Sequence, residues 1–114
     1  MCVPVLTRAQ EPYREREARA LFEAGQEAYM QADFEGALQS FQRAYELSQR
    51  RELLFNCAQA ADRMREDHVA LEYYRRFLNG APESEPRRVA ESRVEFLTRL
   101  EEEANDTSSE ARTT

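Results

Sequence analysis

The sequence predicts an all-α protein of about five helices, in which one helical hairpin occurs twice. Only three Gly and four Pro interrupt the 114 residues, and long stretches are rich in Ala, Glu, Arg, Leu and Gln. These residues lose little side-chain entropy in a helix, which favours helical structure. The chain also matches itself at a distance of 33 residues. The identical pairs at that distance are Leu21/Leu54, Phe22/Phe55, Gln26/Gln59, Ala28/Ala61, Ala37/Ala70, Leu38/Leu71 and Arg43/Arg76.

A repeat of this length is typical of a solenoid of stacked helical hairpins. In such a stack each hairpin buries its apolar face only against a neighbour, so the last hairpin needs a helix to cover it. The chain length allows one domain, since domains usually have about 100–200 residues.

The first hairpin is expected to follow a flexible lead-in over residues 1–11. Helical spacing starts at Pro12, which is acceptable in a first turn, and predicts a helix over residues 12–32. The stripe of this helix consists of Leu21, Ala24, Gly25 and Ala28. Asp33 is placed to cap a second helix, over about 34–49, through its carboxylate. The stripe of the second helix consists of Ala37, Leu38, Phe41, Ala44 and Tyr45.

The second hairpin repeats this pattern. A helix over about 51–65 carries a stripe of Leu54, Cys57, Ala58 and Ala61. Asp67 is the expected N-cap of the following helix. The stripe of that helix consists of Ala70, Leu71, Tyr74, Phe77 and Leu78. Asn79-Gly80 followed by Pro82 predicts its end, because Gly80 readily takes the left-handed conformation.

A fifth helix is expected over about 84–103, with Ser84 as its N-cap. Its apolar side consists of Ala90, Val94, Leu97 and Leu100. Its outer side is polar, so the helix is suited to cover the second hairpin. Residues 104–114 are small and polar and predict a disordered tail.

Charge and apolar content argue against two classes of partner. The net charge is −6, whereas phosphate binding needs a basic face, so no nucleic-acid partner is expected. No run reaches the ~20 apolar residues that a membrane span requires, so no membrane insertion is expected. Residues 1–10 are too short and not apolar enough for a secretory signal, which favours the cytoplasm. A periplasmic or exported protein with a trimmed signal peptide is the alternative.

No pattern of residues predicts catalysis, a metal site or a cofactor. The close carboxylates, such as residues 101–103, fall where a helix face meets water, which favours a solvated surface over acid–base chemistry. His68 has no second His or Cys nearby in the sequence, as a metal site would need. Cys57 belongs to an apolar stripe, which favours a buried thiol over a nucleophile. We therefore expect a protein that is not an enzyme and holds neither a metal nor a cofactor.

At the repeated positions the sequence resembles the tetratricopeptide repeat (TPR). The motif of that family has a small residue in its first helix and an Ala in its second. An aromatic residue follows four positions later, and a small residue three positions beyond that. The first copy fills these places with Gly25, Ala37, Phe41 and Ala44, and the second fills three of them with Ala58, Ala70 and Tyr74. The resemblance implies a right-handed solenoid over residues 12–103, with repeats over about 18–50 and 51–83 and a capping helix over about 84–103.

Three positions depart from the family pattern. Leu21 replaces the usual Trp, Arg51 lies near the usual inter-repeat Pro, and Phe77 replaces the last small residue of the second repeat. Phe77 therefore suggests an altered packing against the fifth helix. Residues 51–64 also resemble a subgroup of bacterial repeat proteins, many of which are exported.

The resemblance implies a protein-binding module, an adaptor or scaffold whose partner is a protein or peptide. Partners of the family lie on the concave surface formed by the first helices of the repeats. On this chain that surface falls on Arg19, Phe22, Gln26, Tyr29, Met30, Phe55, Asn56, Gln59, Asp62 and Arg63. Aromatic side chains beside amides suit an extended peptide or a partner helix.

Two alternatives stay open at the level of the sequence. Phe22 and Phe55 can instead pack sideways on each other, which would leave the surface without its aromatic anchors. The chain can also serve as a structural unit, a homo-oligomer in which the open N-terminal flank stacks on a second copy.

Overall fold

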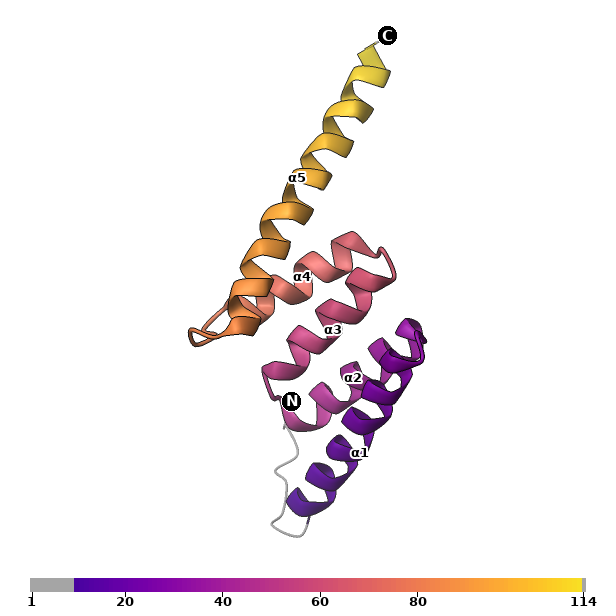
Figure 1. Ribbon diagram of the computed structural model, residues 1–114, viewed down its shortest axis with the longest axis vertical. Coiled ribbons are helices and arrows are strands. Elements are labelled where there is room, and N and C mark those ends of the chain that lie inside the picture. The colour runs from indigo at the N-terminus through magenta and orange to yellow at the C-terminus, as the bar shows by residue number, and fades with distance from the viewer. Residues whose placement is uncertain (1–9, 114) are drawn as a thin grey trace, which may run out of the picture.

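The computed structural model describes residues 10–113, with the side chains of residues 10–108. This part of the chain is all-α and has five helices, which are α1 (Glu11–Met30), α2 (Phe34–Ser48), α3 (Glu52–Arg63), α4 (Asp67–Leu78) and α5 (Glu85–Thr113). Each helix packs against the next one in the chain, so α1 and α2 form one hairpin, α3 and α4 a second, and α5 covers α4 (Figure 1). The predicted fold class is confirmed.

The turn between the two helices has the same geometry in both hairpins, and the equivalent residues are 33 positions apart in the sequence. Ala32 and Arg65 both adopt the left-handed backbone conformation, with φ of 63° and 61°. In the first turn the Asp33 N–H donates to the carbonyl of Ala28 at 2.8 Å. In the second turn the Glu66 N–H donates to the carbonyl of Ala61 at 3.0 Å. Such bonds satisfy carbonyl groups that a helix end leaves without an intrahelical partner. The sequence repeat is therefore also a repeat of backbone structure.

Two of the three predicted N-caps are confirmed. The Asp33 carboxylate and the Ser84 hydroxyl each accept a hydrogen bond from the N–H three residues later, at 3.0 Å and 3.2 Å. The predicted cap at Asp67 is wrong, because α4 already begins at Asp67 and Glu66 takes the N-cap position without a side-chain hydrogen bond. The repeat explains this shift, since Glu66 is the counterpart of Asp33.

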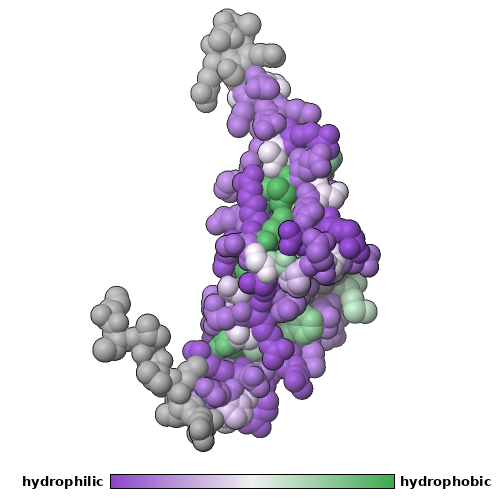
Figure 2. All heavy atoms as spheres, turned by 90° about the vertical axis from the view of Figure 1, so that its left-hand side faces the viewer, coloured by the Kyte–Doolittle hydropathy of each residue, from purple (hydrophilic) through white to green (hydrophobic). Residues whose placement is uncertain are grey.

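Small and aromatic side chains form the core between successive helices. The buried residues of the first cluster join α2 to α3 and are Ala37, Phe41, Ala44, Leu53, Cys57 and Ala60. Those of the second join α3, α4 and α5 and are Leu54, Ala58, Ala61, Ala70, Leu71, Tyr74, Phe77, Ala81, Ala90 and Leu97. On the face shown in Figure 2 the surface is mostly hydrophilic, and hydrophobic atoms occupy small areas between hydrophilic ones.

The buried side of α1 differs from the predicted stripe. Ala24 is exposed, whereas Cys57, its counterpart in α3, is fully buried. The difference arises because α2 packs on that face of α3, while no described helix precedes α1. The buried residues of α1 are Ala18 and Gly25.

The first half of α5 covers the second hairpin, and the second half extends away from the other helices (Figure 1). This helix continues to Thr113, where the sequence predicted a disordered tail from residue 104. Residues 102–108 are exposed, as their polarity requires. They are helical because the chain has no Gly or Pro after Pro86, so nothing interrupts helix propagation.

At the other end, α1 includes Glu11, the last residue of the predicted lead-in, and residues 1–9 lie outside the described part. Within residues 10–113, none of the helices has the length and apolar character needed to cross a membrane.

Candidate functional site

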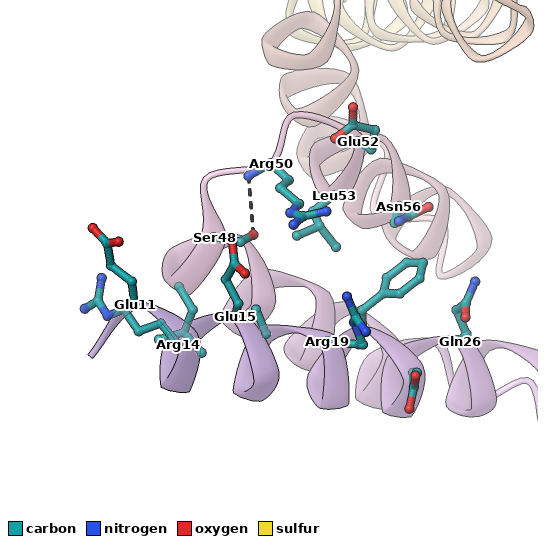
Figure 3. A pocket seen from close by; sticks show the side chains of 14 residues that line it. Glu11, Arg14, Glu15, Arg19, Gln26, Ser48, Arg50, Glu52, Leu53 and Asn56 are labelled. Atoms are coloured by element: carbon teal, nitrogen blue, oxygen red, sulfur yellow. Dashed lines mark hydrogen bonds between the residues drawn. The ribbon is translucent and has the colours of Figure 1, made fainter. Parts of the chain in front are cut away.

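A groove of about 670 Å³ lies between α1 and the start of α3, next to the link from α2 to α3. We refer to it as the α1–α3 groove. Its lining residues are Glu11, Arg14, Glu15, Ala18, Arg19, Phe22, Glu23, Gln26, Leu47, Ser48, Arg50, Glu52, Leu53 and Asn56. Figure 3 shows Glu11 and Arg14 towards one end, Gln26 and Asn56 towards the other, and Leu53 between them.

The extra length of α1 creates one wall of this groove. α3 begins at Glu52, whose counterpart in the first repeat is Arg19. The part of α1 before Arg19, which is about two helical turns, therefore has no equivalent in the second repeat. These helical turns of α1 lie opposite the link between α2 and α3, so the groove forms at this end of the first hairpin.

The floor of the groove is apolar and is held in place by the core. Ala18 and Leu53 are buried. Phe22 is half-buried, and its ring packs on that of Phe41 with a centroid distance of 6.0 Å and an interplanar angle of 44°. The amides of Gln26 and Asn56 lie beside this floor (Figure 3).

The rim of the groove is charged and of mixed sign. Its acidic side chains are Glu11, Glu15, Glu23 and Glu52, and its basic side chains are Arg14, Arg19 and Arg50. None of these seven forms an ion pair with another described residue. The rim can therefore pair with charges of either sign on a molecule that enters the groove.

The groove contains four of the ten predicted site residues, namely Arg19, Phe22, Gln26 and Asn56. It extends from them towards the N-terminus of α1, whereas the prediction extended towards the C-terminal ends of α1 and α3. Glu11, Glu15 and Ala18 lie on the same helical face as Phe22, at spacings of 11, 7 and 4 residues. Helical periodicity traced backwards from Phe22 would have found them.

Phe55 is half-buried, packs against the core and does not line the groove. Its ring packs on Phe77 at 5.2 Å and on Tyr74 at 6.0 Å. The contact with Tyr74 repeats the contact of Phe22 with Phe41, 33 residues earlier and at the same 6.0 Å. Sideways packing of Phe22 on Phe55 is therefore not the arrangement in the structure, since each ring packs on an aromatic residue of its own hairpin.

Tyr29 and Arg63 belong to a separate cluster at the far end of the first hairpin. The Tyr29 ring meets the Phe34 ring edge-on at 5.1 Å. The Arg63 guanidinium lies over both rings, 4.6 Å from the centroid of Phe34 and 5.9 Å from that of Tyr29. Met30 is 85% exposed, and it lies outside the groove, as does the half-buried Gln59.

Asp62 holds α5 against the second hairpin and is not a groove residue. Its carboxylate accepts two hydrogen bonds of 2.8 Å from the Arg93 guanidinium and one of 3.0 Å from the Tyr74 hydroxyl. Two-point arginine–carboxylate pairs of this kind are among the stronger polar contacts in proteins. Burial, together with the adjacent Asp62 carboxylate, raises the pKa of the Tyr74 hydroxyl, which therefore stays protonated and donates.

The described residues include no group of three or more His, Cys, Asp or Glu side chains that could hold a metal ion. His68 pairs with Glu101 on the surface, with 3.1 Å between Nδ1 and Oε1. Burial raises the pKa of the Cys57 thiol to about 12, so this thiol is neutral near pH 7 and is a poor nucleophile.

The 33-residue repeat of the sequence thus recurs in the turns and in the ring contacts of the two hairpins. The α1–α3 groove is the feature from which a function can be inferred. Comparison of the chain with protein-family models, with curated proteins and with solved structures gives no match.

Proposed function

We propose that the chain is a protein-interaction module of the TPR type, an adaptor or scaffold that binds an extended peptide or a helix of a partner protein in the α1–α3 groove. One observation carries this proposal, namely the combination of an apolar floor with a charged rim whose side chains form no ion pair with another described residue. An apolar floor gains free energy when a ligand removes it from water, and polar groups around it fix the orientation of the ligand.

The dimensions of the groove suit a short peptide. Its volume of about 670 Å³ lies within the range of about 300–1,000 Å³ that is usual for ligand sites. Its length along α1, from Glu11 to Gln26, is about 22 Å at the helical rise of 1.5 Å per residue. An extended peptide of about six or seven residues spans that distance. The side-chain amides of Gln26 and Asn56 can both donate to and accept from a peptide backbone.

The TPR assignment is supported by the way the repeat recurs in three dimensions. Gly25 and Ala58 occupy the same position in the first helix of each hairpin and are both buried. The aromatic residues Phe41 and Tyr74, which the family places opposite them, are buried as well. Small residues against aromatic rings allow the close helix packing on which such hairpins depend.

Stacking of a second copy on the open flank of α1 is less well supported. In α3 the face that packs on the preceding hairpin has Leu53, Cys57 and Ala60. The counterparts in α1 are Ala20, Ala24 and Glu27, and all three are exposed. A copy stacked in the same way would gain little apolar area and would bury the Glu27 carboxylate, which is costly without a partner.

The test begins with capture of binding proteins on the immobilised chain, identification by mass spectrometry, and calorimetric titration of the purified partner. Phe22→Ala should weaken binding by about 1–3 kcal/mol, as loss of an aromatic anchor does. Gln26→Ala should weaken it by about 0.5–1.5 kcal/mol through loss of a hydrogen bond. Circular dichroism checks that each variant is folded, because Phe22 also contacts Phe41.

Matched controls come from the repeat itself. Gln59→Ala removes the same side chain at the equivalent position outside the groove, and Met30→Ala removes an exposed apolar side chain of α1. Both should bind the partner as the unaltered chain does. Normal binding by folded Phe22→Ala and Gln26→Ala variants, with weaker binding by Arg43→Ala on the outer surface, would show that the groove is not the site.

A further inference from the structure

We propose that residues 1–9 of the chain are a ligand for the α1–α3 groove of the same molecule. This inference rests on the proposed function, because it takes the groove to be a peptide-binding site. These residues, with the sequence MCVPVLTRA, directly precede Gln10 and lie outside the described part of the chain. The proposal follows from where they are attached, from their length and from their chemistry.

The point of attachment lies at one end of the groove. Glu11, the first residue of α1, is also a lining residue, and only Gln10 separates it from the segment. Nine extended residues span at most about 30 Å. The groove is about 22 Å long from Glu11 to Gln26. Gln10 itself has helical backbone angles, so a segment that reverses direction just before Gln10 can run along most of the groove.

The chemistry of the segment matches the floor. Residues 3–6, Val-Pro-Val-Leu, are an uninterrupted apolar run in a chain whose net charge is −6 and in which 33% of residues are charged. Pro4 fixes its own φ and disfavours a helical conformation at Val3, so this run favours an extended form. Ordering such a run costs less conformational entropy than ordering a flexible one. The half-buried side chains of Phe22 and Leu47 provide the apolar surface that it needs.

The rim at this end of the groove, which also includes Arg14, offers two carboxylates to the one charged side chain of the segment. Arg8 is the only charged residue of the segment and is three positions from Glu11. Glu11 and Glu15 line the groove at this end, and neither forms an ion pair with a described residue. Covalent attachment adds to these contacts, since short flexible linkers give effective concentrations in the millimolar range. A partner protein would therefore have to displace the segment, which makes residues 1–9 an internal competitor.

The experiment uses the full chain with a nitroxide spin label on Cys2. The label modifies Cys2 selectively in the folded protein, because Cys57 is fully buried. A segment that runs from Gln10 along the groove places Cys2 near its far end. We expect the backbone amide signals of Gln26 and Asn56 in the ¹⁵N-labelled chain to lose more than half of their intensity relative to the reduced label. Signals of α4, which contributes no residue to the groove, should keep their intensity.

Two pairs of substitutions provide the matched control without changing the net charge. Val5→Asn with Leu6→Asn removes the apolar run and should abolish the loss of signal at Gln26 and Asn56. Thr7→Asn with Ala9→Asn changes the same number of residues outside the run and should preserve it. Weak, uniform broadening in the unaltered chain, or broadening centred on α4, would overturn the proposal.

A mixed sample separates binding within one molecule from binding between two. Spin-labelled chain without ¹⁵N is added to ¹⁵N-labelled Cys2→Ser chain, and groove signals should then be unaffected. Broadening there would place the segment in the groove of a second copy and would overturn the intramolecular proposal. Failure of this inference is distinct from failure of the proposed function. A captured partner that depends on Gln26 supports the groove as a binding site even when the spin label has no effect.

Discussion

At the scale of single residues, packing depends on small side chains where helices meet. A Cβ atom on Gly25 would lie 2.6 Å from Cε1 and 2.7 Å from Cδ1 of the Phe41 ring. These distances are far inside van der Waals contact, so Gly25 is required by the approach of α1 to α2. Ala24 directly precedes Gly25 in the same helix and is exposed, because no described helix covers that side of α1.

Gly25→Leu should therefore destabilise the fold, whereas Ala24→Leu should not. Overpacking of a tight core position costs about 1–3 kcal/mol or more, which exceeds the gain of about 1 kcal/mol that replacing Gly brings to a helix. The free energy of unfolding from urea titration measures both variants. Equal stability of the two leucine variants would show that α1 and α2 do not cross at Gly25.

At the scale of helices, α5 is held to the second hairpin by both apolar and polar contacts. Ala90 and Leu97 are fully buried, and Arg93 binds Asp62 through two hydrogen bonds. The Asp62 side chain is only 14% exposed, so its pairing with Arg93 is shielded from solvent more than an ordinary surface pair. The His68–Glu101 pair joins α4 to α5 as well, but the His68 side chain is 83% exposed.

Asp62→Ala should lower the free energy of unfolding by about 1–3 kcal/mol, because Arg93 and Tyr74 lose their shared acceptor. His68→Ala should change it by only about 0–1 kcal/mol, as is usual for exposed ion pairs. Denaturant titration compares the two variants. In the double variant Asp62→Ala/Arg93→Ala, the second substitution should add little, since the interaction is already lost. Fully additive effects would contradict the assignment of this pair as the polar anchor of α5.

The C-terminal end of α5 provides a second test at the scale of the helix. Removal of residues 104–114 should leave the melting temperature unchanged, since residues 102–108 are exposed and the contacts of α5 end at Leu100 and Glu101. The same truncation should lower the total helical ellipticity, because these residues continue the helix up to Thr113. Circular dichroism at 222 nm measures both effects. An unchanged total ellipticity would favour the disordered tail that the composition predicts.

At the scale of the whole molecule, the chain is elongated. Its radius of gyration is 17.1 Å and its principal extents are 63 × 38 × 30 Å. A compact domain of this length would have a radius of gyration of about 13 Å. The excess follows from stacking helices in chain order and from the protruding end of α5 (Figure 1).

We expect a monomer over micromolar concentrations, because the open side of α1 lacks the apolar residues that α3 uses for stacking. Sedimentation equilibrium should give the chain mass of 13.3 kDa at every concentration. A mass that rises with concentration, and that Ala24→Arg restores to the monomer value, would favour the self-stacking alternative.

The sequence located only part of the groove that we propose as the site. The TPR resemblance placed Arg19, Phe22, Gln26 and Asn56 on the predicted binding surface, and all four line the groove. The position of the groove depends on the two extra helical turns at the start of α1. The sequence shows a helical pattern from Pro12 onwards, but it does not show that these turns lie against the link between α2 and α3. The resemblance placed Asp62 on the binding surface, whereas its carboxylate binds Arg93, 31 residues away in the sequence. No local pattern joins two residues that meet only when α5 docks.

The sequence by itself determined the helical class, the 33-residue repeat, the caps at Asp33 and Ser84, and a small residue at position 25. These features depend on the local sequence or on contacts within one hairpin, where helical periodicity fixes which residues face each other. The tertiary structure alone decided that Ala24 is exposed while Cys57 is buried, and that Phe22 lines a groove while its counterpart Phe55 packs on Tyr74 and Phe77 outside it. Equivalent residues of a repeat have the same local conformation but different neighbours, and burial depends on the neighbours.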